Sequence, residues 1–204
     1  MSLTLMNDSP QSSGSDSETV SPFDPVAYRI DQDGLITWVN EAWQNFAAKN
    51  GGETIMGDRM IGKSVWECVV DNSLRSIYKL LVQRAKEGIP VCYRYRCDAP
   101  DRRRWLAMTI SNLASGELEF ESTLLREETR ESVPLLELHR PRGEHFVRIC
   151  SWCQMMATEY QGWLPVEKAV EVSGILEEEE FPKITHTICP RCQKVVMGQF
   201  GSGH

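Results

Sequence analysis

Two pairs of cysteines near the end of the chain have the spacing of metal ligands. Cys150 and Cys153 lie in "ICSWC", and Cys189 and Cys192 lie in "HTICPRC". A C-x-x-C pair turns two thiolates toward one side of a tight loop, and two such pairs complete a tetrahedral shell that suits Zn²⁺. The 35 residues between the pairs exceed the common spacing of about 15–20. We expect a small insertion to span them, with "VEKAVEVSGI" as a mildly amphipathic helix.

Three interpretations of these cysteines compete. A structural zinc would stabilise a segment too small to build a sufficient core of its own. A thiol-disulfide redox switch would need thiols of lowered pKa, and simple buried cysteines are the third interpretation. His186 precedes Cys189 by three residues and could replace one ligand, but a histidine at the surface or behind the ligands is favoured.

Composition and charge narrow the class of protein. The chain has 204 residues and a net charge of −7, so no basic footprint for nucleic acid is visible. No apolar run is long enough to span a membrane, and no signal peptide opens the chain. An odd count of seven cysteines argues against a secreted disulfide framework. These features predict a cytoplasmic protein that binds neither nucleic acid nor membrane.

The chain divides by composition and periodicity into five segments. Residues 1–24 contain four acids and no Lys or Arg, and their Ser-rich composition predicts a disordered tail. The first domain is expected at 25–127, a polar connector with one helical turn at 128–142, the cysteine module at 143–198 and a short tail at 199–204. Catalytic motifs such as H-E-x-x-H, a Walker A loop or a nucleophile elbow are not found, so no enzyme is predicted.

Local sequence patterns predict the order of strands and helices in the first domain. Asp33-Gly34 indicates a hairpin between two strands in 27–40, and Asn40, Ser64 and Asp71 are N-caps for helices at 41–50, 64–70 and 72–87. Residues 51–63 read as a loop. Period-2 alternation predicts three antiparallel strands at 90–98, 104–113 and 117–127.

This order resembles a PAS sensor domain over roughly residues 25–127. "DQDGLITWVNEAWQNFA" is similar to the opening of that family, "IGKSVWECV" to its next segment, and "YRYRCDAPDRRRWLAMTI" to its third and fourth strands. The resemblance implies an α+β fold with a five-stranded antiparallel sheet, to which the cysteines add a small zinc-stapled module. It also implies a sensor that binds a small molecule or a partner protein against the inner face of the sheet, and a homodimer.

The expected ligand pocket combines the alternating strand positions with the helix faces, although for each side chain taken separately a role in the core alone is favoured. Its residues are Val39, Trp43, Phe46, Ile77, Leu81, Tyr93, Tyr95, Leu106, Met108, Ile110, Leu118 and Phe120.

The sequence also discriminates among cofactors of the family. No histidine lies within 25–127, which disfavours a His-ligated haem. Cys68 lacks the surrounding motif of the flavin photosensors and is interpreted as a buried small hydrophobe; neither it nor Cys97 has an activating motif for a covalent chromophore. The PAS ligand is therefore unknown. "DRRR" at 101–104 is expected to be a solvated turn, with anion or partner capture as the alternative.

The ending of the chain resembles an element found after PAS domains in bacterial signalling proteins. That element pairs an upstream "ICSWC" and a tryptophan, here Trp163, with an H-x-I-C-P-x-C close, and it matches residues 148–192. Together the two resemblances predict a bacterial sensor or adaptor that passes its signal through a zinc module to a separate effector protein. The alternative function is a thiol-disulfide redox sensor that uses the two C-x-x-C pairs.

Overall fold

The computed structural model describes residues 24–50, 52 and 55–200. The predicted acidic tail therefore lies outside the described residues except for Asp24, and so does the segment 201–204. Helix α6 (Pro190–Phe200) extends two residues into the segment expected as the C-terminal tail.

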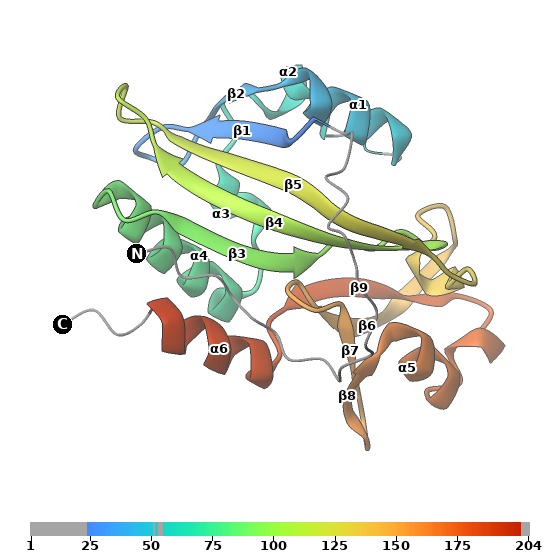
Figure 1. Ribbon diagram of the computed structural model, residues 1–204. Helices are drawn as coiled ribbons and strands as arrows, with labels where there is room; N and C mark the ends of the chain where they lie inside the picture. The colour runs from blue at the N-terminus through green and yellow to red at the C-terminus, as the bar shows by residue number, and fades with distance from the viewer. Residues whose placement is uncertain (1–23, 51, 53–54, 201–204) are drawn as a thin grey trace, which may run out of the picture.

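A five-stranded antiparallel sheet dominates the first half of the chain (Figure 1). It contains β1 (Val26–Ile30), β2 (Ile36–Val39), β3 (Val91–Arg96), β4 (Arg102–Asn112) and β5 (Leu118–Thr129) in the order β2-β1-β5-β4-β3. Register places Val91 opposite Ile110, and Ile110 opposite Phe120. These side chains share the inner face and are buried, as the period-2 alternation predicted. The expected α+β class with this sheet is confirmed.

Among the described residues, four α-helices lie between β2 and β3. They are α1 (Glu41–Lys49), α2 (Gly57–Met60), α3 (Val65–Cys68) and α4 (Asn72–Lys86). The predicted caps are confirmed: side chains of Asn40, Ser64 and Asp71 accept backbone N–H bonds that begin α1, α3 and α4. The expected loop at 51–63 is wrong in part, because it contains α2. Within the described chain, no helix has the length and apolar character needed to cross a membrane.

A second, four-stranded sheet follows a short 3₁₀ turn at Pro134–Leu136, the helical turn expected in the connector. It contains β6 (Arg142–Cys150), β7 (Met155–Thr158), β8 (Gly162–Pro165) and β9 (Phe181–Thr187) in the order β8-β7-β6-β9. Strands β6 and β9 are parallel neighbours. The crossover between them carries α5 (Val166–Val172), where the amphipathic helix was expected, and a 3₁₀ turn at Ile175–Glu177. The sequence patterns did not reveal this sheet.

Two hydrophobic cores fill the molecule, and the second sheet contributes to both. Ile149 packs with Met156 and Val166 under α5. The next residue, Cys150, belongs to the core of the first sheet together with Leu81 of α4 and buried side chains of the sheet's inner face. Both Ile149 and Cys150 have 0% exposure. Figure 1 shows why: the second sheet and α6 lie against the side of the first sheet that carries α4.

Candidate metal centre and adjoining cavity

Parallel pairing of β6 and β9 brings the two cysteine pairs together. Cys150 is the last residue of β6 and stands opposite Thr187, the last residue of β9. Because the carboxyl ends of parallel strands meet at one edge of a sheet, the turn after β6 and the helix start after β9 are neighbours. Cys189 follows Thr187 by two residues, so both pairs reach the same point although 35 residues separate them.

Each pair occupies a tight turn. Gln154 has a φ of 57° and donates its N–H to the Cys150 carbonyl at 2.9 Å, which closes the first turn. In the second pair, Cys189 immediately precedes α6 and Cys192 lies in its first turn. There the N–H of Cys192 donates to the Cys189 Sγ at 3.4 Å, and the N–H of Cys189 donates to the Cys150 Sγ at 3.3 Å. Such N–H···S bonds favour the thiolate form that binds metals.

The four Sγ atoms lie within 4.8 Å of one another. The Sγ atoms of Cys153 and Cys189 are 3.8 Å apart. Four sulfurs at about 2.3 Å from one tetrahedral zinc would stand roughly 3.8 Å apart, so this spacing fits the ion. Cys150 and Cys189 are buried, and Cys153 and Cys192 are half-buried. His186 is not a member of this group.

The thiols of this cluster share charge unequally. Hydrogen bonds from Cys153 and Cys192 lower the pKa of Cys150 to about 2. Donation to the Cys150 sulfur raises the pKa of Cys153 and of Cys192 above the ordinary thiol value. The cluster therefore favours one negative charge, on Cys150, and the thiols of Cys153 and Cys192 stabilise it by hydrogen bonding. Full ionisation of the cluster needs a cation among the sulfurs.

The other cysteines are placed away from this cluster. Cys68 and Cys92 are exposed, and Cys97 is half-buried. The interpretation of Cys68 as a buried hydrophobe is wrong, because Cys68, the last residue of the single-turn helix α3, is exposed and lines a cavity between the two regions. Burial raises the pKa of Cys97, which makes that thiol a poor nucleophile.

A cavity of about 430 Å³ opens between the inner face of the first sheet, α3, α4 and β9. Among the described residues, three of the twelve predicted pocket side chains line it: Trp43, Met108 and Phe120. The others lie elsewhere in the first region, and their assignment to a pocket stays a prediction. Six are buried in the core, namely Ile77, Leu81, Tyr93, Leu106, Ile110 and Leu118; Val39, Phe46 and Tyr95 are partly buried.

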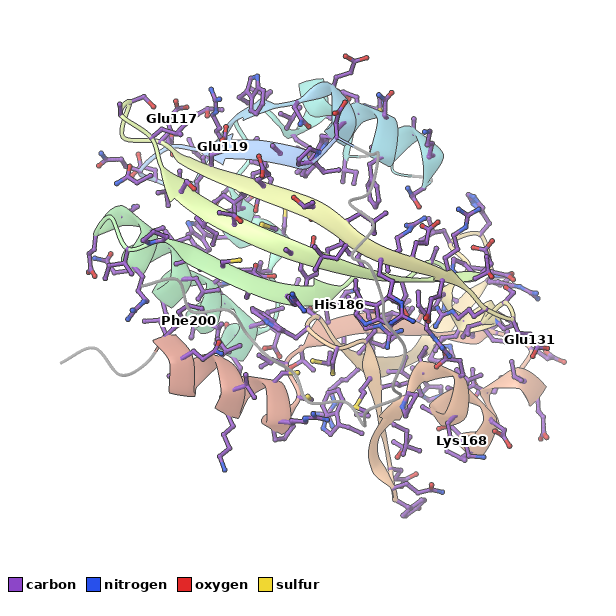
Figure 2. The ribbon with its side chains drawn as sticks, in the orientation of Figure 1. Glu117, Glu119, Glu131, Lys168, His186 and Phe200 are labelled. Carbon is purple, nitrogen blue, oxygen red and sulfur yellow. The ribbon has the colours of Figure 1, made fainter. Side chains whose placement is uncertain are left out.

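The second region supplies a wall of this cavity that sequence reasoning missed. Ser151, Ile184, Thr185 and His186 line it, opposite aromatic side chains such as Tyr78. Figure 2 labels His186 near the end of β9 that leads to α6. His186 lies outside 25–127, so the expectation against a His-ligated haem stays a prediction. No local pattern could have revealed a wall formed by residues so distant along the chain.

Backbone and aromatic contacts join the first cysteine turn to the edge strand β3. The N–H of Arg96 donates to the Trp152 carbonyl at 2.9 Å, and Gln154 Nε2 donates to the Arg96 carbonyl at 3.2 Å. The Trp152 ring stacks on Tyr93 with centroids 4.8 Å apart. The cysteine turn therefore extends the inner face of the first sheet.

A partly buried ionic network makes a second joint between the regions, at the start of β4. Asp98 and Arg130 have side chains only 0% and 4% exposed, and they pair at 3.1 Å. Arg130 also pairs with Glu167 of α5 at 2.7 Å, as does Arg103 at 2.9 Å. Burial alone would raise the pKa of Glu167, but its hydrogen bonds with the backbone, Arg130 and Arg103 lower that pKa to about 2.

The arginines of "DRRR" are thus engaged within the chain. Arg103 reaches α5, and Arg104 binds Glu127 at 2.8 Å and Asn50 Oδ1 at 3.0 Å. Arg102 pairs with the same Glu127 at 3.1 Å. The expectation of a solvated turn is wrong for Arg103 and Arg104, which bind side chains of other elements.

Comparisons with known proteins give structural similarity over half of the chain. No family model matches the sequence, and no curated protein does. A domain of an HTR-like protein from Haloarcula marismortui is 13% identical over 50% of this chain and 98% of its own, with a TM-score of 0.35. A domain of a sensory box sensor histidine kinase/response regulator from Geobacter sulfurreducens is 15% identical over 50% and 86%, with a TM-score of 0.36. The PAS domain of the Cronobacter turicensis quorum-sensing receptor RpfR, in complex with C12:0, is 15% identical over 53% and 100%, with a TM-score of 0.37.

Proposed function

We propose that this chain is a cytoplasmic signalling sensor or adaptor. Its PAS-like region takes a small ligand in the cavity, and its four clustered cysteines hold one structural zinc. The zinc-bound region passes the state of the cavity to a separate effector protein. The observation that carries this proposal is the common wall: Ser151 lies between two of the clustered cysteines and also lines the cavity.

The chemistry of the cysteine cluster supports a structural ion. Four sulfur donors close the tetrahedral shell and leave no open position for a substrate, so the proposal includes no catalytic role. Bound zinc would supply a fixed cross-link between the end of β6 and the start of α6. The homodimer, the effector protein and the lack of a nucleic-acid partner, all expected from the sequence, stay predictions.

A thiol-disulfide sensor is the second candidate. The observation that favours it is the 3.8 Å separation of the Cys153 and Cys189 sulfurs, which a small movement would shorten to a disulfide bond of about 2.05 Å. Such a bond would join the two turns in the way that zinc does. It would respond to oxidants, whereas bound zinc would protect the thiols.

Native mass spectrometry of the chain, purified without chelator and under argon, tests both candidates. We expect the mass of one zinc per chain, lost on denaturation. A Cys189→Ser variant should lose the zinc, and the matched Cys92→Ser variant, at an exposed cysteine outside the cluster, should keep it. A metal-free mass lowered by the hydrogens of one or two disulfides would reject the zinc and favour the redox sensor.

A further inference from the structure

The cavity beside the cysteine cluster has two chemically different sides. The first region contributes mainly apolar and aromatic side chains, including Phe120, Met108 and Tyr78. The second region contributes the polar residues Ser151 and Thr185, together with His186. Apolar walls with a few convergent polar groups are typical of small-molecule sites, where the polar groups fix the orientation of the ligand.

This division specifies the chemistry of a suitable ligand. Flat aromatic or conjugated molecules suit walls of aromatic rings, since offset and edge-on ring contacts are favourable. One hydrogen-bonding group at one end of the ligand would meet the polar residues Ser151 and Thr185. A ligand with charges at both ends would leave one of them buried against apolar side chains, which is costly.

The polar residues of the cavity lie on the same two segments as the cysteines. Ser151 stands between Cys150 and Cys153, and its N–H donates to the Thr187 carbonyl at 2.9 Å. Thr185 and His186 lie on β9, which leads directly to Cys189. A metal at the four sulfurs would therefore fix both strands that carry the polar groups.

A single hydroxyl joins this polar side to the helices of the first region. Thr187 Oγ1 donates to Asp71 Oδ2 at 3.0 Å. Asp71 is the N-cap of α4, and the helix presents Leu74 and Tyr78 to the cavity. Movement of β9 would therefore shift the polar residues on β9 and, through Asp71, the start of α4, both of which line the cavity.

We propose that the cavity binds a flat, mainly apolar ligand with one hydrogen-bonding end, and that the metal at the four cysteines sets the affinity for it. This inference rests on the proposed function, because it requires both the zinc and the cavity. By linkage, the ligand must raise the affinity for zinc by the same factor as zinc raises the affinity for the ligand.

The test uses prodan, a flat naphthalene ketone whose fluorescence reports the polarity around it. Prodan is titrated into the full chain, first zinc-loaded and then stripped of metal, with zinc content measured in each sample. We expect binding to be about tenfold weaker in the metal-free chain, within the range of typical coupling between sites. Saturating prodan should raise the zinc affinity by the same factor.

Three variants locate the effect. Met108→Trp should fill the cavity and abolish prodan binding, while one zinc per chain is retained. Thr187→Val removes the hydroxyl that binds Asp71 and should weaken prodan binding by about threefold in the zinc-loaded chain. This measurement does not require the metal-free chain to be stable. Thr109→Val, the same chemical change on the other face of β4, should leave prodan binding unchanged.

The outcomes separate this inference from the proposed function. Equal prodan affinity with and without zinc, or in Thr187→Val and the parent chain, would overturn the coupling and leave the zinc and the cavity standing. Failure of the zinc-loaded chain to bind prodan, or full binding by Met108→Trp, would overturn the ligand chemistry. A chain that neither contains nor takes up zinc would overturn the proposed function as well.

Discussion

The two sheets differ in how their strands are paired. The first sheet is antiparallel: β3, β4 and β5 pair through short turns, and β1 pairs with β5 from the other end of the domain. In the second sheet, β6 pairs in parallel with β9, which follows only after two strands and α5. Parallel strands cannot be joined by a tight turn, so no hairpin fixes the ends of β6 and β9 against each other. We therefore expect the second sheet to depend on whatever holds these strand ends together, and that is where the cysteines lie.

The largest expected effect removes a member of the cysteine cluster. Cys150→Ser should abolish zinc binding and lower the free energy of unfolding by several kcal/mol, because structural zinc contributes of order 10 kcal/mol in small zinc domains. In hydrogen exchange, β6 and β9 should lose protection while β4 and β5 keep theirs. Denaturant unfolding and peptide-resolved exchange measure the two effects.

Cys92→Ser is the matched control for that change. Cys92 is exposed on β3, so the free energy of unfolding should stay within about 0.5 kcal/mol of the parent value. Equal stability of the two serine variants would contradict a structural zinc. Equal loss of protection in both sheets of Cys150→Ser would show that they unfold as one unit.

The next effect concerns the ionic joint between the regions. Arg130→Met should leave the Asp98 carboxylate buried with fewer partners, which typically costs about 3–5 kcal/mol. Arg96 also pairs with Asp98, so we expect the lower end of that range. Lys168→Met is the control: its pair with Glu171 has side chains 54% and 68% exposed and should contribute less than about 0.5 kcal/mol. Denaturant unfolding measures both variants. A similar loss of unfolding free energy in the two would show that the ionic network stabilises the chain no more than an exposed ion pair does.

Acid should weaken the same joint through Glu167. The pKa of this carboxyl is lowered to about 2 in the folded chain, from an ordinary value of 4.5. A lowered folded-state pKa contributes stability that is present above about pH 4.5 and is lost as the pH falls toward 2. Glu167 is partly exposed, so we expect a contribution of at most about 2 kcal/mol.

Glu167→Gln isolates that contribution. The variant should lose stability at neutral pH, and its free energy of unfolding should fall less steeply than that of the parent chain between about pH 5 and pH 3. Denaturant titrations at several pH values measure the slope. Parallel curves for the two chains would assign the acid sensitivity to other carboxyls.

The same difference between the regions explains what the sequence could predict. Strands and helices of the first region carry local signals, since each cap and each alternating strand is complete within about ten residues. The cysteine spacing predicted the cluster because a C-x-x-C turn is local too. Strand β9, "FPKITHT", has no alternation that shows its parallel partner, and the polar wall at Thr185 and His186 exists only through that pairing. The rest of the candidate site, the polar wall on β9, forms only through pairing of strands distant in sequence, and no local pattern in the sequence predicts that pairing.

The smallest expected effect tests that contrast at a helix start. Asn40 Oδ1 accepts the N–H of Trp43 at 2.9 Å and of Ala27 at 3.1 Å, whereas α5 starts at Pro165, for which the structure gives no side-chain cap. Asn40→Ala should therefore cost about 1 kcal/mol, as the loss of a cap typically does, and exchange should accelerate first in α1. Pro165→Ala should leave the start of α5 unchanged in exchange, because its packing on β7 and β8 determines where that helix begins. Faster exchange in α5 than in α1 would mean that both helices depend on local signals to the same degree.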